Sequence, residues 1–332
     1  MWTYMARRAK AKKMKTQRFL YYNIAHSGNG SDDTYIDLAR DLSAVNRRLY
    51  RQGMEYSISN ISVHDSQGDA QVLISTAPST WATHESWQLA FDGWKRQRAQ
   101  LLEEAGGNMQ TPRWSDFKVY LNKEHVYDGD WPSVVDDGNQ AILGTGANNG
   151  AEWDYADMSF NKGGLRFDDH AIGLLGTHQF SSITNETTPH DTSYDGYVSC
   201  IEGLQEIRTQ PVKEEGYDLV ATQSPFSGFN LLSPAALLDN LTEIVDENDN
   251  PPYSLEFVGS NTNPADDTGA FPVRECHISS TYSPMAMMGP IPNIPCGLMQ
   301  VRTTASANNT IGLLIELTPG DYKGVHATPM GN

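Results

Sequence analysis

Cysteine is scarce in this chain of 332 residues. The three cysteines, Cys200, Cys276 and Cys296, are an odd number, lie far apart and form no C-x-x-C pair. This usage supports neither a disulfide framework nor a zinc ribbon. Because a chain of this length buries a substantial core without cross-links, we expect reduced, structural thiols.

Long apolar runs are also missing: no stretch is long enough to span a bilayer, and the mean hydropathy is negative. The first residues show neither the apolar segment of a signal peptide nor the Ser-rich amphipathic pattern of a transit peptide. We therefore expect a soluble product that does not insert into a membrane.

Catalytic signatures are absent as well, since the sequence contains no H-E-x-x-H, G-x-S-x-G or P-loop motif. The glycine-rich segment from Gly144 to Gly150 has the wrong spacing for a dinucleotide fingerprint. The acid and histidine group at residues 168–170 is of a kind that chance produces in so acidic a chain. We expect that the protein is not an enzyme.

Charge is abundant but unevenly placed. The stretch MARRAKAKKMKTQR, from Met5 to Arg18, carries seven of the 24 basic residues, and the first acid is Asp32. The rest of the chain then has 17 Lys and Arg against 41 Asp and Glu, a net charge of −24. Such an asymmetry is typical of a terminal arm with a partner of its own.

The charge density of this arm predicts a polyanion as its partner. Without core-forming residues the arm cannot offset its own ordering entropy, so it should be disordered when free. Lys and Arg side chains that contact phosphates bind nucleic acid without sequence preference and with a steep salt dependence. Nuclear import, an acidic membrane surface and a solvated terminus remain alternatives. The residues assigned to nucleic-acid binding are Arg7, Arg8, Lys10, Lys12, Lys13, Lys15 and Arg18.

Beyond the arm, short alternating runs separated by Pro, Gly and Asn indicate a body made mainly of strands. Residues 54–63 alternate with a break near Ser59 and Asn60, which predicts a strand with a bulge, and residues 69–76 follow as its hairpin partner. Residues 310–317 place four apolar side chains on one face. The other predicted strands are 19–24, 116–121, 171–175, 197–201, 217–221, 253–258, 273–279 and 298–303.

One long helix is predicted at about residues 83–105. Trp87, Phe91 and Trp94 lie on its apolar stripe, and the glycine pair 106–107 ends it. We expect the stripe to pack on the strands of the body. The basic side chains that should be solvated near the C-terminal end of this helix are Lys95, Arg96 and Arg98.

The fold class follows from the balance of these elements. Weaker patterns predict a helix or turn within residues 34–50 and a short helix at 234–245. Many short strands, long loops and one prominent amphipathic helix favour a mainly β, antiparallel jelly-roll sandwich over a parallel βαβ sheet. We divide the chain into an arm, residues 1–18, and a single domain with large loop insertions, residues 19–332.

An acidic motif, VDENDNPPY from Val245 to Tyr253, closely resembles the calcium-linker sequence of cadherin repeats. Carboxylate, amide and backbone oxygens are the hard ligands that calcium prefers. The similarity covers nine residues and no ladder of repeats accompanies it, so a polar turn stays an alternative. Calcium is the one cofactor that the sequence suggests, and its candidate ligands are Asp246, Asn248, Asp249 and Asn250.

Four further segments carry a resemblance to a known family. They are RFLYYN at residues 18–23, TAPSTWAT at 76–83, WSDFKVYL at 114–121 and IELTPGDYKGVHATPM at 315–330. Together with the basic arm and the strand-rich body, they resemble the capsid proteins of small circular single-stranded DNA viruses. Seven charges make a modest arm for that family, whose arms are often longer and richer in arginine.

The resemblance implies a jelly-roll subunit that self-assembles into an icosahedral shell, with the arm facing inward on the packaged genome. The implied partners are further copies of the chain, single-stranded nucleic acid and a host surface receptor. The implied locations are the virion and, during assembly, the host cell nucleus. Apolar contributors to the contacts between subunits would include Met285, Met287 and Met288.

Two alternatives belong to other functional classes. A carbohydrate-binding or carbohydrate-active β-sandwich protein would use exposed aromatic side chains such as Trp131 and Trp153 together with acids from the loops. A calcium-dependent adhesion module would use residues 246–250 and should lose stability in a chelator. A carbohydrate protein should stay a small species with or without nucleic acid, whereas a capsid protein should assemble.

Overall fold

The computed structural model describes residues 15–26, 30–65, 69–104, 114–127, 153–162, 165–180, 183–184, 193–209, 258–259, 269–279, 281, 283–305 and 308–331. The elements predicted at 217–221 and 234–245, and nearly all of that at 253–258, lie outside these residues. The described part is mainly β, with antiparallel sheets. None of the helices it contains is long and apolar enough to cross a membrane.

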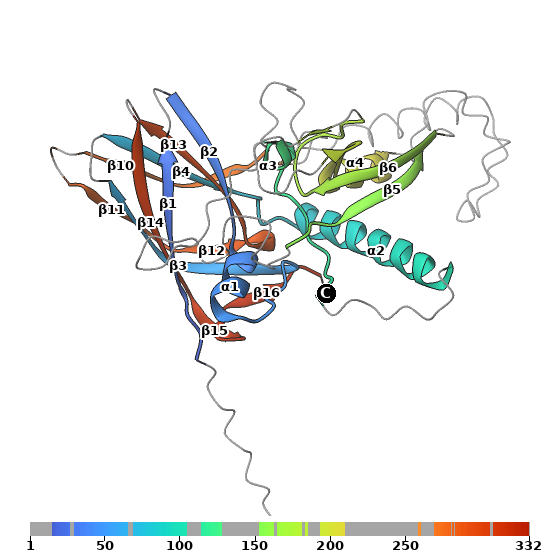
Figure 1. Cartoon of the computed structure of the whole chain (residues 1–332), viewed down its shortest axis with the longest axis horizontal. Coiled ribbons are helices and arrows are strands. Elements are labelled where there is room, and N and C mark those ends of the chain that lie inside the picture. The colour runs from blue at the N-terminus through green and yellow to red at the C-terminus, as the bar shows by residue number, and fades with distance from the viewer. Residues whose placement is uncertain are drawn as a thin grey trace, which may run out of the picture.

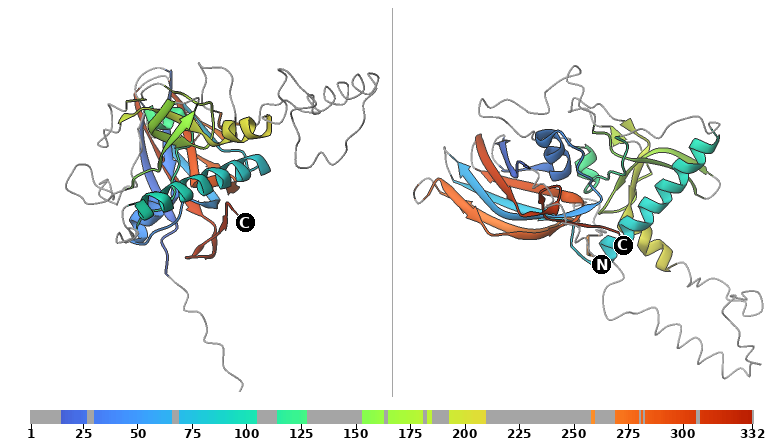
Figure 2. Two further views of the ribbon diagram at one scale, coloured as in Figure 1. Left: turned by 90° about the vertical axis from the view of Figure 1, so that its right-hand side faces the viewer. Right: turned by 90° about the horizontal axis from the view of Figure 1, so that it is seen from below.

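Two antiparallel sheets face each other (Figure 1). The first sheet has the order β1 (Phe19–His26), β14 (Asn309–Leu317), β3 (Met54–Asp65), β11 (Met285–Met288), and β12 (Ile291–Ile294) and β16 (Ala327–Pro329) also pair with β3. The second sheet has the order β10 (Phe271–Ile278), β4 (Ala70–Thr76), β13 (Leu298–Ala305), β2 (Gly30–Asp37). Figure 2 shows that both sheets are curved, and the main apolar core draws its side chains from both of them.

Alternation along each strand decides which side chains enter this core, since successive side chains of a strand point to opposite faces. On β1, Leu20 and Tyr22 are buried whereas Phe19 and Tyr21 are exposed. Each large apolar side chain removed from water in this way contributes about 1.5–3 kcal/mol. The four apolar residues predicted on one face of 310–317 are all fully buried, which confirms that assignment: Ile311, Leu313, Ile315 and Leu317.

The predicted bulge is confirmed, but the predicted hairpin is wrong. In the β3–β14 pairing, Glu316 is opposite Asn60 and Leu317 is opposite Ile58, so Ser59 is the extra residue. Strand β4 lies in the second sheet, between β10 and β13, and does not pair with β3. The apolar face of β4 closes the core opposite that of β3, and a hairpin would have placed both strands in the same sheet.

Smaller elements lie beside the two sheets. A third sheet consists of β5 (Asp157–Lys162), β6 (Leu165–Gly173) and β9 (Gly196–Ser199), with β9 parallel to β6. Strands β7 (Ile183–Thr184) and β8 (Ser193–Tyr194) pair with each other, and β15 spans Pro319–Tyr322. The described helices are α1 (Leu38–Asn46), α2 (Trp81–Glu104), α3 (Lys123–Tyr127), α4 (Cys200–Thr209) and the 3₁₀ helix η1 (Pro295–Gly297).

Helix α2 confirms the long predicted helix, although its aromatic stripe packs differently from the prediction. Trp87 is buried, whereas Phe91 and Trp94 are half-buried. All three rings lie against the ring of Phe117, at centroid distances of 5.8, 5.7 and 5.4 Å. Phe117 belongs to an extended segment between the second and third sheets, so this segment separates the stripe from the main core.

Three segments differ from their predicted structure. Residues 116–121 are extended but form a single bridge, between Tyr120 and Gly173, and are not a sheet strand. Residues 197–201 end as a strand at Ser199, after which α4 begins. Within 34–50, the first residues belong to β2, and α1 begins after Asp37, whose side chain caps the helix. The predicted free thiols are confirmed, because all three cysteines are unpaired.

Candidate nucleic-acid interface

The last residues of the arm are fixed to the body. The backbone N–H of Gln17 donates to Asn46 Oδ1 at 2.8 Å, and Asn46 Nδ2 donates to the carbonyl of Gln17 at 3.0 Å. The hydroxyl of Thr16 donates to the carbonyl of Lys323 at 2.8 Å. Gly324 has φ +98°, and a Cβ there would lie 2.3 Å from the Thr16 hydroxyl, so a glycine permits this close approach. The described residues of the arm therefore join the body at one defined place, next to the start of β1, which we call the arm's exit (Figure 1).

Five basic residues surround this exit, and we call them the basic collar: Lys15, Arg18, Arg47, Arg48 and Lys323. The first two belong to the arm, the arginine pair follows the last residue of α1, and the fifth lies in the turn after β15. The amide of Asn46 holds the arm next to the arginine pair. Segments far apart in the sequence thus bring their positive charges together.

Lys323 lies close enough to other cations to be influenced by their charge. Its ammonium donates to the carbonyl of Leu49 and lies 5.6 Å from the ring centre of Tyr50 and 5.2 Å from that of Tyr322. Partial burial lowers the pKa of Lys323, and the nearby positive charges of Arg48 and Arg51 lower it further, whereas the charge of Asp116 opposes this shift. A phosphate at this place would relieve the repulsion between these cations.

The collar lacks carboxylate partners within the part of the chain that the structure describes. No Asp or Glu of that part forms an ion pair with any of the five residues. Arg18 Nε and Arg48 Nη1 are buried and have no hydrogen-bond partner there. Elsewhere arginines are paired, such as Arg51 with Asp116 at 2.9 Å and Arg302 with Asp33 at 2.7 Å.

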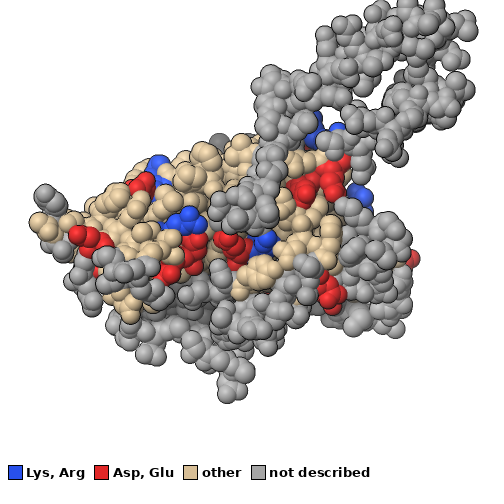
Figure 3. All heavy atoms as spheres, turned by 90° about the horizontal axis from the view of Figure 1, so that it is seen from above, with Lys and Arg blue, Asp and Glu red and all other residues tan. Residues whose placement is uncertain are grey.

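The opposite end of the molecule differs in this respect. Figure 3 views that end, and there the visible basic groups lie side by side with acidic groups. In a chain with 41 acids and 24 bases, a group of five bases without an ion pair to a described acid differs from the face seen in Figure 3. The arrangement is suited to a polyanion that supplies the missing negative charge.

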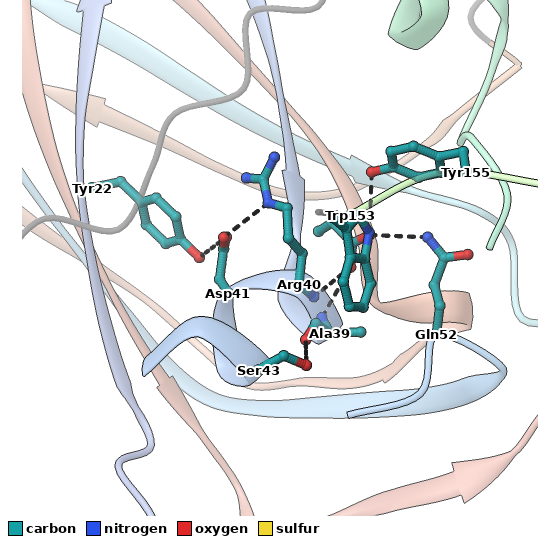
Figure 4. A network of polar contacts seen from close by, with 9 residues as sticks. Tyr22, Ala39, Arg40, Asp41, Ser43, Gln52, Trp153 and Tyr155 are labelled. Atoms are coloured by element: carbon teal, nitrogen blue, oxygen red, sulfur yellow. Dashed lines mark hydrogen bonds and ion pairs between the residues drawn. The ribbon is translucent and has the colours of Figure 1, made fainter. Parts of the chain in front are cut away.

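A buried polar network holds α1, and with it the arginine pair, in place (Figure 4). Asp37 caps α1 by accepting from the N–H groups of Ala39 and Arg40 at 3.0 and 3.1 Å. Its other oxygen accepts from Gln52 Nε2 at 3.0 Å, Trp153 Nε1 at 3.0 Å and the Tyr155 hydroxyl at 3.2 Å. Burial raises the pKa of Asp37, and the charge of Arg40 opposes that shift.

The same helix contributes a second buried carboxylate. Asp41 accepts from Arg40 Nε at 3.0 Å and from the Tyr22 hydroxyl at 2.7 Å, which ties α1 to β1. Burial raises the pKa of Asp41, and Arg40 opposes this effect too. Apart from the half-buried Trp153, these groups are buried, and they are hydrogen-bonded to one another, so the network is suited to positioning α1 rather than to chemistry on a ligand.

Only some of the site residues predicted from the sequence lie among the described residues. Lys15 and Arg18 lie in the collar, whereas the other arm residues, Arg7, Arg8, Lys10, Lys12 and Lys13, lie outside the described residues. The calcium candidates Asp246, Asn248, Asp249 and Asn250 lie outside them too. Within the described ranges no group of three or more His, Cys, Asp and Glu is placed to hold a metal ion.

Two other assignments concern aromatic and basic side chains. Trp153, a candidate sugar platform, is half-buried, and its N–H group is bound to Asp37, so it is not the exposed platform that the prediction required. Trp131 is not among the described residues. On α2, Arg98 lies over the ring of Trp94 at 5.2 Å and is half-buried, while Lys95 and Arg96 are exposed as predicted.

Three residues of the collar were not assigned from sequence. The dipeptide of Arg47 and Arg48 was a visible signal, since two adjacent bases follow a predicted helix. Lys323 gave no local signal, because its place beside the arm depends on pairing between the two ends of the chain. Comparison of this chain with protein-family models, curated proteins and solved structures gives no match. The function is therefore argued from the residues themselves.

Proposed function

We propose that this chain is a structural virion protein, which self-assembles into a closed icosahedral shell and packages single-stranded nucleic acid. The observation that carries the proposal is the basic collar: five positive charges without carboxylate partners in the described structure, at the place where the seven-charge arm leaves an acidic body. The collar extends the phosphate-binding surface from the arm onto the body. No enzymatic activity is part of this proposal.

The chemistry of the collar suits the backbone of a nucleic acid. Guanidinium and ammonium groups bind phosphate oxygens by charge-assisted hydrogen bonds, which carry no base information. Each phosphate contact releases condensed counterions, so binding should weaken steeply as salt is raised.

We also propose that the first and second sheets form a jelly roll, the fold of many viral coat proteins. Its support is the strand order, β1-β14-β3-β11 in one sheet and β2-β13-β4-β10 in the other. Along the chain, β1 and β3 belong to the first sheet and β2 and β4 to the second. In the C-terminal half, β10 and β13 belong to the second sheet and β11 and β14 to the first. Such alternation wraps one antiparallel ribbon around a single core.

Placement in the virion, passage through the host nucleus and recognition of a host surface receptor follow from the same proposal. The carbohydrate alternative needs exposed aromatic side chains such as Trp131 and Trp153. Trp153 does not meet this need, because its N–H group is bound to Asp37. The adhesion alternative depends on residues outside the described ranges and stays a prediction. No described side chain favours either of them over nucleic-acid packaging.

The test is the salt dependence of binding to single-stranded DNA for a collar variant, R47Q/R48Q, in the full-length protein. Removing two phosphate contacts should lower the slope of log K against log salt by about 1.4, since each contact on a single strand contributes about 0.7. The matched control is R96Q/R98Q on α2, which changes the charge equally and should leave the slope unchanged. Equal effects of the two variants, or no effect of the collar variant, would contradict the proposal.

A further inference from the structure

Strand β1 forms one edge of the first sheet. It pairs with β14 on one side, and no described strand pairs with its other side. The N–H of Leu317 donates to the carbonyl of Arg18 at 3.0 Å, so these two residues form a hydrogen-bonded pair of the ladder. Because such pairs alternate, the backbone groups of every second residue from Arg18 point to β14. The backbone groups of the residues between them point outward, at Phe19, Tyr21, Asn23 and Ala25.

This row of outward backbone groups lies at the molecular surface. Tyr21 and Ala25 are exposed, and no described residue forms a hydrogen bond with their backbone N–H or C=O groups. The carbonyl of Phe19 accepts from the side chain of Gln17 at 3.5 Å, which is longer than a usual hydrogen bond. Such a row of donors and acceptors is a template for a further strand.

The other described edges of the two main sheets carry features that hinder such pairing. Strand β10 contains Pro272 and a shift of register after it, and β11 has only four residues. The edge of β2 carries Asp32 and Asp33. In β1, by contrast, the sequence FLYYNIAH contains no Lys, Arg, Asp, Glu or Pro. Among the described edges of these two sheets, that of β1 is therefore the one suited to contact with another chain.

We propose that β1 pairs with β1 of a second copy of this chain, antiparallel and about a two-fold axis, so that the first sheets of the two copies become continuous. The inference rests on the proposed self-assembly and assigns one of its contacts to named residues. A two-fold contact uses the same surface on both copies, so a single strand suffices to form it. If the whole strand is used, Phe19 is opposite Ala25 of the second copy, and Tyr21 is opposite Asn23.

The side chains of β1 favour a second copy as the occupant. Phe19 and Tyr21 are exposed on the outer face of the sheet, where Leu314 of the neighbouring strand is exposed too. Pairing about a two-fold axis would continue this apolar face from one copy to the next. An acidic or basic partner would find no opposite charge along β1, whereas an identical uncharged strand meets no repulsion there.

The basic collar decides the orientation of the two strands. Lys15 and Arg18 come directly before β1, so parallel pairing would place the collars of both copies side by side, where their charges repel. Antiparallel pairing separates the two collars by the length of the strand, about 26 Å for eight residues. This distance exceeds the screening length of about 8–10 Å near physiological salt, and both collars stay accessible to nucleic acid.

Disulfide cross-linking tests the contact and its orientation. Two full-length variants, F19C and A25C, carry C276S as well, because Cys276 is the native thiol that is not fully buried. Oxidised as a mixture, with single-stranded DNA at moderate salt, they should form a covalent dimer. A hydrogen-bonded antiparallel pair has Cα atoms about 5.5 Å apart, within the range of about 4.4–6.8 Å for a disulfide. Either variant alone should give no dimer, since the two equivalent positions would lie about 20 Å apart.

The matched control is a mixture of F19C with T310C. Thr310 is exposed and is opposite Ala25 within one copy, one strand further from the proposed contact. Its Cα would lie about 10 Å from that of Phe19 in the second copy, which is too far for a disulfide. This mixture should therefore give no covalent dimer.

A second pair of variants tests the backbone groups of the edge. A25P removes an outward N–H and leaves the bonds to β14 in place, as proline permits on the open side of an edge strand. A25V changes the same side chain but keeps the N–H. Both variants should unfold cooperatively in urea. A25P alone should lose the large species that the wild type forms with single-stranded DNA at moderate salt.

The inference is overturned if the mixture of F19C and A25C gives no more dimer than the mixture of F19C and T310C, or if either variant alone cross-links as strongly. It is also overturned if A25P forms the large species as the wild type does. Wild-type particles without the cross-link would refute this contact and leave the proposed function standing. A failure of the proposed function is a different result, since R47Q/R48Q would then leave the salt slope of DNA binding unchanged.

Discussion

The carboxylate of Asp37 accepts five hydrogen bonds, two from the backbone of α1 and three from the side chains of Gln52, Trp153 and Tyr155. The network joins β2 and α1 to the segments that precede β3 and β5. Such a group is a strong determinant of position, because each donor would be left unsatisfied in a buried place if the carboxylate were removed.

We predict that D37A lowers the free energy of unfolding by about 3–5 kcal/mol, as expected when one partner of a buried charged network is removed. The control is D33A, which removes the carboxylate that pairs with Arg302, a residue with 41% of its side chain exposed. That variant should cost below about 1 kcal/mol, because the pair is partly solvated. Similar losses in urea-unfolding measurements of both variants would refute the distinction.

A second residue-scale prediction concerns pH. His84 Nε2 lies 3.6 Å from Glu55 Oε1, and this contact raises the pKa of His84. Burial tends to raise the pKa of Glu55, but hydrogen bonds with His84, Ser79 and Thr328 outweigh it and lower that pKa. The raised histidine stabilises the fold below its ordinary pKa of 6.5 and loses this effect as pH rises through its folded-state value. The lowered glutamate stabilises above 4.5 and loses the effect as pH falls.

The pair should therefore contribute most between about pH 4.5 and 6.5. We predict that the difference in unfolding free energy between wild type and H84Q is largest in this window and declines on both sides. Chemical unfolding across pH measures it, and E55Q should abolish the dependence. A difference that is flat across this range, or that grows above pH 8, would contradict the pairing.

At the scale of elements, the aromatic residues on the apolar stripe of α2 differ in how deeply they are buried. Phe117 has 1% of its surface exposed and touches all three rings of the stripe, whereas Phe91 is half-buried. We predict that F117A costs about 3–5 kcal/mol, as for a fully buried large-to-small change, and that F91A costs about half as much. Unfolding free energies of the two variants test this order. A larger loss for F91A than for F117A would contradict the prediction.

The long helix and the strands in which apolar and polar residues alternate strictly were predictable. The spacing of their apolar residues indicates both the type of element and the face that is buried. The partner of β4 was not, since alternation shows which face of a strand is buried but not which sheet it joins. Strand β11 was missed because its four residues, MAMM, are all apolar and show no alternation, and β12 was missed because Pro292 and Asn293 interrupt its apolar pattern. In the candidate site, the arm was predictable from its run of basic residues. Lys323 was not, because it lies beside the arm only through contacts between residues far apart in the sequence.

On the scale of the whole molecule, assembly must overcome repulsion between acidic bodies. A row of side chains crosses the outer face of the first sheet, where Tyr21 is opposite Leu314, Leu314 opposite Ser62, and Ser62 opposite Met287. Ser62 is half-buried, and the three apolar members of the row are exposed. Met285 is exposed beside this row, whereas Met288, also expected at a contact, is buried in the core. An apolar face with few charges is suited to contact between subunits.

We predict that M287D abolishes the large species that the full-length protein forms with single-stranded DNA at moderate salt. L101D is the control, because Leu101 is similarly exposed, at 61% against 68%, but lies on α2. Sedimentation and negative-stain microscopy should show particles for wild type and L101D alone. Monomers or dimers for the wild type under every condition, with and without calcium, would refute the assembly proposal.

Strand β1 pairs with β14 along its whole length, from Phe19 opposite Glu316 to His26 opposite Asn309. During synthesis, β1 therefore cannot pair until β14 has been made, almost three hundred residues later. Such long-range pairing is slow and leaves strand edges open meanwhile. Since Thr16 is tied to Lys323 across the same seam, the collar cannot exist on a ribosome-bound fragment. A nascent chain would thus meet nucleic acid with its arm alone, and gain its full binding surface only after release.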